Sequence, residues 1–317
     1  MKGDLSPFKR AQARDKSEFP VASVLKMYYN RQWICMKGKN AMIRLIATDL
    51  DDTLLDASAA LTARTRRALD AAMALGCGIT LSSGRMLEAM LPFAEEIGVN
   101  APMLLFNGAM IYDHRTDETL YAPRIPCATA LGIVRLVEEM GYYIQLYPGK
   151  GYYCSEIRDC TRAYARQIAV PATPVGMPMA QWLAQNPSDM QKMLIIDTPE
   201  GADRMQAVLR EAFPHGACYL KSKPHFLEIA PEGVDKGRSL ATLAQHLSLS
   251  PDEVMAFGDG QNDVPMLMYA GAGYAMANAC AQALACTPLV APPNTEDGVA
   301  RVIESYIAQG KIGAMKR

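Results

Sequence analysis

Acidic side chains crowd the end of an apolar segment in this 317-residue chain. In the stretch LIATDLDDTLL (45–55), Asp49, Asp51 and Asp52 follow a run of apolar residues, and Asp56 comes directly after it. Two carboxylates about 4 Å apart repel each other by about 4 kcal/mol at an effective dielectric near 20. Several carboxylates at this spacing therefore need a cation beside them.

Polar and charged side chains also stand at the ends of other expected elements. They are Ser82, Ser83 and Arg85 in SSGR, Lys236 at the start of a helix, and Asp259 and Asp263 in GDGQND. Each segment alone is weak evidence, because solvated acidic turns, helix caps and exposed lysines are common. Together they end strands or begin helices at one edge of a sheet, where ligands of open α/β sheets bind.

The residue types in these segments favour a magnesium site. Oxygen ligands suit Mg²⁺, which keeps several waters and shares substrate phosphate. Zinc is a poor fit because the segments contain no His or Cys. An EF-hand loop starting at Asp259 would need Glu at its twelfth position, which is Ala270. A lysine and a small hydroxyl beside such a site are groups that bind a phosphoryl group.

The elements that would position these residues alternate along the chain from residue 43. IRLIATD (43–49) is an apolar run typical of a buried parallel strand. A helix is expected at 62–76, with Thr62 as its N-cap and Gly76 as its stop. Further expected elements are a strand at 78–84, a helix at 86–98, two short strands around Asn107-Gly108, a helix at 236–247, a strand at 253–259 and alternating elements up to 308. This order predicts an α/β fold with a doubly wound, mostly parallel, Rossmann-like sheet.

The middle of the chain changes character. Residues 125–224 mix helices and strands without the βα alternation, which predicts an inserted α+β cap domain between core segments 42–124 and 225–317. Residues 1–41 are polar and mixed in charge and contain no apolar signal segment, so we expect a poorly ordered N-terminal extension. Met42 is a candidate natural start.

Composition excludes several partners. The formal net charge of −1 provides no global basic field for nucleic acid or an anionic membrane, and no stretch approaches the ~20 apolar residues of a membrane span. Eight cysteines without C-x-x-C spacing or a signal peptide predict reduced, buried thiols in a cytoplasmic protein. The tyrosine-rich stretch 141–154 is expected to pack inside the cap, with a stacking platform for substrate as the alternative. The oligomeric state is left open.

Together the motifs resemble the haloacid dehalogenase (HAD) superfamily, and within it the Cof-type phosphatases with a class II, subtype B cap. The resemblance covers residues 43–308. It is carried by DLDDTLL, SSGR, FNGA, FLEIAPEGVDKG, GDGQND and NTEDGVA, which stand in the family's order and spacing. It implies a Mg²⁺-dependent phosphatase that hydrolyses a small phosphorylated metabolite through an aspartyl-phosphate.

The resemblance also implies roles for single residues. Asp49 would be the nucleophile. Asp51 would protonate the leaving group and then deprotonate the attacking water, and neighbouring carboxylates would favour its protonated form. Lys236 would neutralise the phosphoryl charge. Mg²⁺ would be held by Asp49, the backbone carbonyl of Asp51, Asp259 and, in support, Asp263.

Other motif residues would contact phosphate or substrate, namely Ser83, Gly84, Arg85, Asn107 and Asn262. Ser83 stands where threonine is common in the family, which keeps the hydroxyl. Ala277 stands where glycine is usual, in a turn away from the chemistry. Asp52 fills a variable position, and Asp56 is expected outside the site.

Two other functions share these motifs. A sugar phosphomutase would use the same core residues and return the phosphoryl group to a sugar. A non-catalytic sensor would merely accept a phosphoryl group on Asp49, but such a sensor has no need of the general acid Asp51. Turnover of a generic phosphate ester separates these functions.

Overall fold

The computed structural model describes residues 42–315, so the predicted N-terminal extension, residues 1–41, lies outside the described range. Within that range the strands form three sheets. The first is entirely parallel and has the order β14-β13-β12-β1-β2. Its strands are β1 (Leu45–Thr48), β2 (Gly78–Leu81), β12 (Val254–Gly258), β13 (Ala272–Met276) and β14 (Val290–Ala291).

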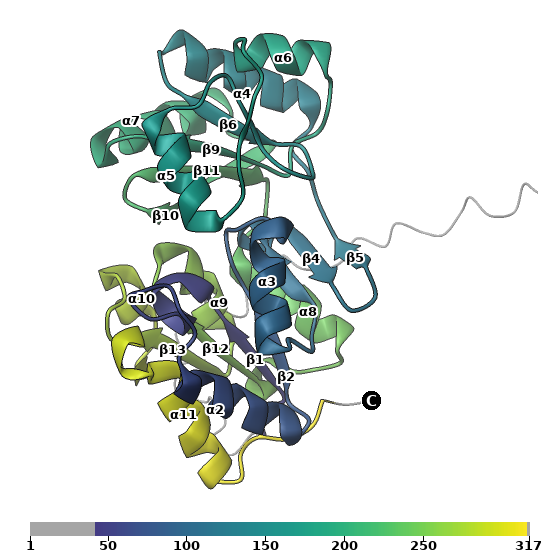
Figure 1. Ribbon diagram of the computed structural model, residues 1–317, viewed down its shortest axis with the longest axis vertical. Helices are drawn as coiled ribbons and strands as arrows, with labels where there is room; N and C mark the ends of the chain where they lie inside the picture. The colour runs from purple at the N-terminus through teal and green to yellow at the C-terminus, as the bar shows by residue number, and fades with distance from the viewer. Residues whose placement is uncertain (1–41, 316–317) are drawn as a thin grey trace, which may run out of the picture. The chain divides into compact units, whose positions relative to one another are not determined.

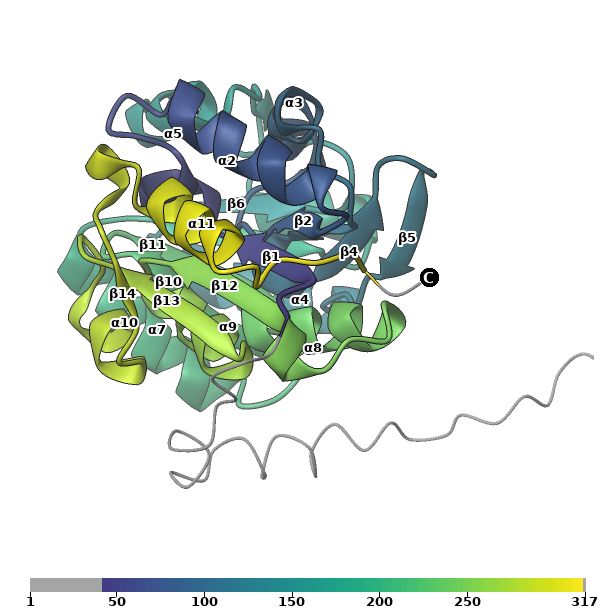
Figure 2. The same ribbon diagram turned by 90° about the horizontal axis from the view of Figure 1, so that it is seen from below.

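Helices cover both faces of this parallel sheet, as Figure 2 shows. Side chains alternate along β1, so Ile46 packs on one face while Leu45 and Ala47 pack on the other. The Ile46 face carries α2 (Ala63–Ala74), α3 (Leu87–Ile97) and α11 (Gly298–Ala308). The opposite face carries α8 (Lys236–His246), α9 (Val264–Tyr269) and α10 (Ala281–Cys286). This is the doubly wound, Rossmann-like core that the sequence predicts.

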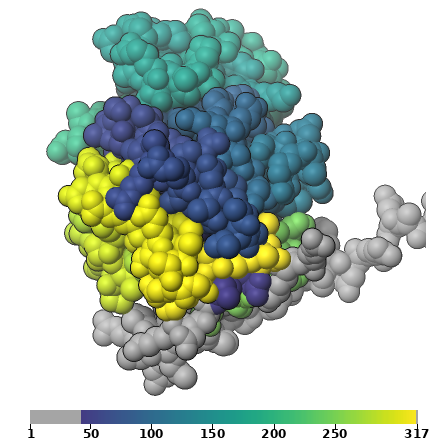
Figure 3. All heavy atoms as spheres, turned by 60° about the horizontal axis from the view of Figure 1, so that its bottom comes forward, coloured from purple at the N-terminus to yellow at the C-terminus, as the bar shows by residue number. Residues whose placement is uncertain are grey.

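The segments near the two ends of the described chain pack against each other on the parallel core. The Thr62 hydroxyl accepts a hydrogen bond from the Thr65 amide and caps α2, as predicted. Helix α2 lies beside α11, and the two form one continuous surface in Figure 3. The Ile43 amide donates to the Lys311 carbonyl at 2.8 Å, which ties the strand entering the core to the chain that follows α11.

The second sheet, which we call the cap sheet, has the order β10-β11-β9-β6-β7-β8. Figure 1 labels its strands β6, β9, β10 and β11. Its strands are β6 (Ile144–Tyr147), β7 (Tyr153–Cys154), β8 (Thr173–Pro174), β9 (Lys192–Ile196), β10 (Ala217–Lys223) and β11 (Phe226–Pro231). Its helices are α4 (Cys127–Glu139), α5 (Asp159–Ile168), α6 (Met179–Gln185) and α7 (Pro199–Ala212). Helices α4, α6 and α7 pack with Met193 and Ile195 on one face. Leu194 points to the other face, toward α5.

The pairing of β11 differs from the predicted organisation. β11 forms an antiparallel hairpin with β10 and also pairs with β9, so it belongs to the cap sheet. The predicted boundary between 224 and 225 therefore falls inside this hairpin, because the ladder with β10 satisfies the backbone of β11 there. The division into 42–124, 125–224 and 225–317 otherwise stays a prediction.

A small third sheet positions two of the predicted site loops. Its antiparallel strands are β3 (Met103–Leu105), β4 (Met110–Asp113) and β5 (Glu118–Tyr121). A single parallel bridge joins Ser82, after β2, to Leu104 in β3. The loops that follow these two strands, SSGR and FNGA, therefore lie side by side.

The predictions for the cysteines are confirmed in part, and the packing predicted for the tyrosine-rich stretch is observed. None of the seven described cysteines is in a disulfide, and Cys35 lies outside the described residues. Only Cys77 and Cys154 are buried, so the expected burial is wrong for the other five, which are partly exposed. Tyr147 and Tyr152 are buried and stacked at 5.1 Å, which confirms the expected packing.

Among residues 42–315, no helix has the length and apolar character needed to cross a bilayer.

Candidate active site

A cavity of about 810 Å³ lies at the carboxyl ends of the parallel strands. β1 ends directly before Asp49, and β12 ends directly before Asp259. Most predicted site residues line this cavity, namely Asp49, Asp51, Ser83, Gly84, Arg85, Asp259, Asn262 and Asp263. The other two, Lys236 and Asn107, make hydrogen bonds to lining residues. The structure thus brings the predicted residues together, while their individual roles stay proposals.

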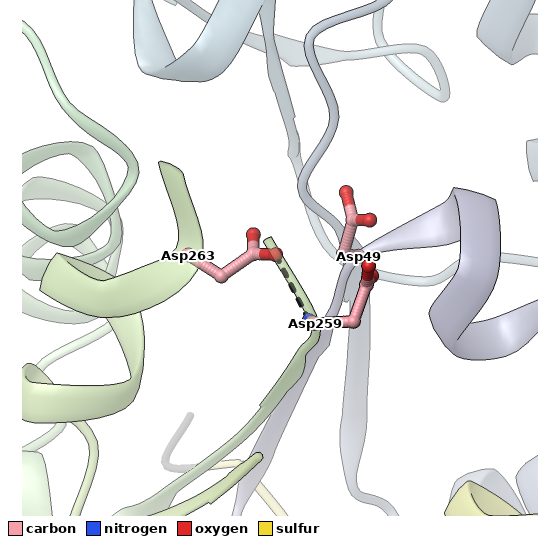
Figure 4. Close-up of side chains that lie close together, drawn as sticks. All are labelled: Asp49, Asp259 and Asp263. Carbon is pink, nitrogen blue, oxygen red and sulfur yellow. Dashed lines mark hydrogen bonds between the residues drawn. The ribbon is translucent and has the colours of Figure 1, made fainter. Parts of the chain in front are cut away.

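Three carboxylates converge at the base of the cavity, as Figure 4 shows. Asp49, Asp259 and Asp263 each present an oxygen within 4.8 Å of the others. Asp263 Oδ2 accepts hydrogen bonds from the backbone amides of Asp259 at 3.1 Å and Gly260 at 2.8 Å. A Cβ at Gly258 would lie 2.4 Å from Asp263 Cβ, so only glycine allows this close approach.

Lys236 is the cation of this cluster. It is the first residue of α8, whose N-cap, Asp235, accepts a hydrogen bond from a backbone amide in the first turn. The fully buried Lys236 Nζ donates to Asp49 Oδ1 and to Asp263 Oδ1, each at 2.6 Å. Burial alone would lower the pKa of Lys236, but the two carboxylates outweigh burial and raise it above its usual value. Lys236 therefore carries its charge at neutral pH.

The carboxylates themselves are crowded. Burial raises the pKa of Asp49 well above its usual value; Lys236 opposes this shift, and Asp263 and Asp259 add to it. Burial, followed by the charge of Asp263, raises the pKa of Asp259 to about 7, against a hydrogen bond from Thr53. Once ionised, the three carboxylates and one ammonium leave two negative charges unbalanced. Hard oxygen donors with this charge deficit fit a divalent cation such as Mg²⁺.

Arg85 holds Asp51 beside the acidic cluster. Its guanidinium donates two hydrogen bonds to the Asp51 carboxylate, at 2.8 and 2.6 Å. Its backbone amide donates to the Ser83 hydroxyl at 3.1 Å. The sequence predicted that neighbouring carboxylates favour a protonated Asp51. That expectation stays a prediction; the group that contacts the Asp51 carboxylate here is a guanidinium from another loop.

The two predicted asparagines contact each other. Asn262 Nδ2 donates to Asn107 Oδ1 at 2.9 Å, and Asn107 is buried with a left-handed backbone at φ 57°. Asn107 Nδ2 has no hydrogen-bond partner among the described residues. An unpaired buried amide donor beside the cavity is available to a ligand oxygen.

Sequence reasoning missed three residues. Thr53 Oγ1 donates to Asp259 Oδ1 at 2.6 Å, and its place two residues after Asp51 in DLDDT was the available signal. Lys192 and Glu228 line the cavity from the cap sheet. Their signal was a charged residue within an apolar strand pattern, in QKMLIID and FLEIAP.

The two remaining acidic residues of the first segment, Asp52 and Asp56, differ in whether they line the cavity. Asp52 lines the cavity and lies 3.7 Å from Lys223 Nζ. The Asp56 carboxylate instead accepts hydrogen bonds from Ser58 and from the Ala60 amide in the next turn. Asp56 is not among the residues that line the cavity, so it lies outside the site, as expected.

Known proteins are similar to this chain in sequence and fold. The family of haloacid dehalogenase-like hydrolases matches residues 46–303. Pyridoxal phosphate phosphatase YbhA of Escherichia coli (strain K12) is 27% identical over 287 residues, covering 83% of this chain and 98% of YbhA. A haloacid dehalogenase-like hydrolase from Bacteroides thetaiotaomicron superposes with a TM-score of 0.75 at 26% identity, covering 83% of this chain and 99% of that one.

A further solved structure is similar in fold alone. BT4131, described as a HAD subclass IIB sugar phosphatase, superposes with a TM-score of 0.72 at 20% identity, covering 83% of this chain and 98% of that one. The family match spans the parallel core, the cap sheet and the whole acidic cluster. This chain therefore belongs to the haloacid dehalogenase-like hydrolases, and it is a phosphatase.

Proposed function

We propose that this phosphatase requires Mg²⁺ and hydrolyses a small phosphorylated metabolite through a phosphorylated Asp49. The observation that carries the proposal is the setting of Asp49 on the cavity. One of its oxygens is held by the Lys236 ammonium, and two further carboxylates lie within 4.8 Å. A carboxylate fixed in this way is a nucleophile with a cation ready for the charge of an incoming phosphate.

The metal would be held by the three clustered carboxylates, with the backbone carbonyl of Asp51 as a further oxygen ligand. Hard oxygen donors and a deficit of two positive charges support this assignment. Bound there, Mg²⁺ would supply positive charge that stabilises the phosphate oxygens. Thr53 would orient Asp259 through its 2.6 Å hydrogen bond.

In the first half-reaction, an Asp49 oxygen would attack phosphorus as the bond from phosphorus to the leaving oxygen breaks. Asp51 would give its proton to that oxygen, and Arg85 would orient Asp51 for the transfer. In the second half-reaction, Asp51 would take a proton from water. The water oxygen would then attack phosphorus, releasing inorganic phosphate and restoring Asp49.

Phosphate oxygens would be bound by Lys236, Ser83 and the free amide donor of Asn107. Lys236 begins α8 and contacts Asp49, and Ser83 lines the cavity from the loop after β2. Hydrogen-bond donors fixed in advance around a transferring phosphoryl group are the main source of catalysis in this chemistry.

The cap sheet forms the other wall of the cavity and is mostly polar. Its strands contribute Lys192, Lys221, Lys223 and Glu228, and helices α5 and α7 beside it contribute Gln167, Asp203 and Gln206; the apolar residues of this wall include Ile168, Leu194 and Phe226. A volume of about 810 Å³ suits a small metabolite. A sugar phosphate fits the polar wall, and the name of YbhA adds pyridoxal phosphate as a second candidate.

A cytoplasmic location is part of the same proposal. It is supported by the seven described cysteines, none of which is in a disulfide. Free thiols are typical of reducing compartments.

The test is turnover of a generic phosphate ester with Mg²⁺ or with EDTA. We expect many turnovers per chain with Mg²⁺ and none with EDTA. A phosphomutase would need a sugar bisphosphate activator, and a sensor would release at most one equivalent. Asp49→Asn should lower the rate by about 10⁴-fold or more, whereas the control Asp56→Asn, in the same segment but outside the cavity, should keep it. Wild-type rates for Asp49→Asn would overturn the proposal.

A further inference from the structure

A buried ion pair in the cap sheet takes no part in the proposed chemistry. Lys192 on β9 and Glu228 on β11 are joined by a 2.9 Å contact, and their side chains are only 2% and 4% exposed. Burying two charges removes the hydration of both. The attraction between them seldom exceeds this desolvation penalty, so a buried ion pair usually adds little to the stability of the fold. Such a pair needs a reason other than holding two strands together.

The remaining hydrogen bonds of Lys192 point to that reason. Besides Glu228, Lys192 Nζ donates to the backbone carbonyl of Gly84 at 2.9 Å. Its ammonium also lies 4.9 Å from the ring centre of Tyr147, a cation–π contact. Lys192 thus connects the cap sheet to a loop of the core 108 residues earlier in the chain.

Glu228 holds this ammonium in place. One of its oxygens pairs with Lys192, and the other accepts a hydrogen bond from the Ser222 hydroxyl. Burial alone would lower the pKa of Lys192, but the charge and hydrogen bond of Glu228, together with Tyr164, outweigh burial and raise the pKa above its usual value. The ammonium is therefore present as a donor throughout the neutral pH range.

The cap sheet and the loop also meet at close range. We call Ser83, Gly84 and Arg85 the SGR loop. A Cβ at Gly84 would lie 3.2 Å from Glu228 Oε1 and 3.1 Å from the side-chain amide of Asn107. The loop backbone is therefore clamped between a cap carboxylate and a core amide, in a space that suits glycine best.

Gly84 stands in the chain between Ser83 and Arg85, the two residues of the SGR loop whose side chains take part in the proposed site. Ser83 lines the cavity, and Arg85 holds the Asp51 carboxylate through two hydrogen bonds. The Arg85 amide donates to the Ser83 hydroxyl, so the two ends of the loop are coupled. A shift of the Gly84 peptide would move both groups.

We propose that Lys192 is a positioning residue for hydrolysis, in which its ammonium, anchored by Glu228, fixes the SGR loop from the cap sheet. The inference rests on the proposed function for the roles of Ser83 and Asp51. It goes beyond that function because it makes the catalytic geometry of the core depend on a cap residue that performs no chemistry. The site is complete only when the cap sheet reaches the Gly84 carbonyl.

The first variant is Lys192→Met, which keeps an unbranched apolar stem and removes the ammonium. We expect kcat on a generic phosphate ester with Mg²⁺ to fall by about 10- to 100-fold, the cost of displacing a catalytic group by about 1 Å. KM should change by less than about threefold, because the Lys192 ammonium is occupied by Glu228 and the Gly84 carbonyl and its side chain is only 2% exposed. The control Arg44→Met removes a partly buried ion pair with Glu253 outside the cavity and should keep kcat and KM.

A double variant separates positioning from plain stability. Lys192→Met leaves Glu228 buried without its cation, so it should also lower the melting temperature. Lys192→Met/Glu228→Gln removes both charges and should recover most of that loss. If Lys192 positions the loop, kcat of the double variant stays as low as that of the single variant. If kcat returns with the melting temperature, the pair only stabilises the cap sheet and the proposal is wrong.

Two other outcomes also overturn it. Wild-type kcat in Lys192→Met would show that the Gly84 contact is dispensable. A KM raised more than about tenfold at unchanged kcat would show that Lys192 binds substrate directly. Failure of the proposed function looks different, because the wild-type protein would then show no Mg²⁺-dependent turnover at all.

Discussion

Replacing Lys236 by methionine tests whether one buried ammonium holds the acidic cluster together. Lys236 Nζ contacts one oxygen of Asp49 and one of Asp263, each at 2.6 Å, and it is fully buried. Lys236→Met fills the space of the side-chain stem and leaves two carboxylates without their cation. The metal-free protein should therefore become less stable, and hydrolysis should be lost with it.

The size of the loss follows from these distances. At an effective dielectric near 20, two unit charges 2.6 Å apart attract by about 6 kcal/mol. Desolvation offsets much of this attraction, and removing one partner of a buried pair costs about 3–5 kcal/mol. Lys236 serves two carboxylates, so we expect the upper part of that range, about 4–5 kcal/mol. With a urea slope of about 3 kcal/mol per M, the unfolding midpoint falls by about 1.5 M.

Urea unfolding in EDTA, followed by circular dichroism, measures this loss. Lys236→Met/Asp263→Asn should recover part of it, since one unpaired carboxylate is removed with the lysine. Mg²⁺ should also reduce it, because ligand binding to the folded state stabilises that state and a cation offsets the same carboxylates. The exposed pair of Arg301 and Glu296 provides the control. A Lys236→Met midpoint as close to wild type as that of Arg301→Met would refute the electrostatic reasoning.

Two further predictions concern single side chains. Thr53→Val removes the hydrogen bond to Asp259 and should raise the Mg²⁺ concentration for half-maximal activity about 10-fold or more, as measured by metal titration of turnover; an unchanged value would mean that Thr53 does not orient Asp259. Burial raises the pKa of Cys77 to about 12, so at pH 8 only about one thiol in ten thousand is ionised. Iodoacetamide followed by peptide mass spectrometry should therefore modify partly exposed Cys127 and leave Cys77 unmodified in the folded protein, whereas equal labelling would contradict its burial.

The parallel core was predictable because its signals are local. The apolar run before Asp49 and the one before Asp259 each identify a buried strand, and parallel strands bring their carboxyl ends to one edge. Thr62 marked the start of α2 through its side-chain cap. The positions of the acidic cluster and of Lys236 follow from strand and helix ends, which is why their proximity could be expected.

What the sequence did not reveal depends on contacts between distant loops. Asp51 lies among acidic residues in the chain, yet its carboxylate contacts Arg85, 34 positions later, because the loop after β2 turns toward it. The pair of Lys192 and Glu228 is visible in the sequence only as two charges in apolar strands. The contact of Lys192 with Gly84 forms only where the cap sheet packs against the loop after β2. No local pattern of the sequence predicts a contact between such distant segments.

The division of the chain was harder to predict for a related reason. β11 lies within the predicted core segment 225–317 and carries the start of the motif FLEIAPEGVDKG, which leads to Lys236. Its strand ladder instead pairs with β10 and β9. Backbone hydrogen bonds decide which sheet a strand joins, and side-chain motifs do not report them.

Trapping the covalent intermediate tests the central claim most directly. The wild-type protein, mixed with a ³²P-labelled phosphate ester and Mg²⁺ and quenched in acid within milliseconds, should carry label on the denatured chain. Hydroxylamine should release the label, as it does from acyl phosphates, and peptide mapping should place it on the segment containing Asp49. Asp49→Asn should carry none. Rapid wild-type turnover without any chain-bound label, at a rate that Asp49→Asn matches, would contradict the account.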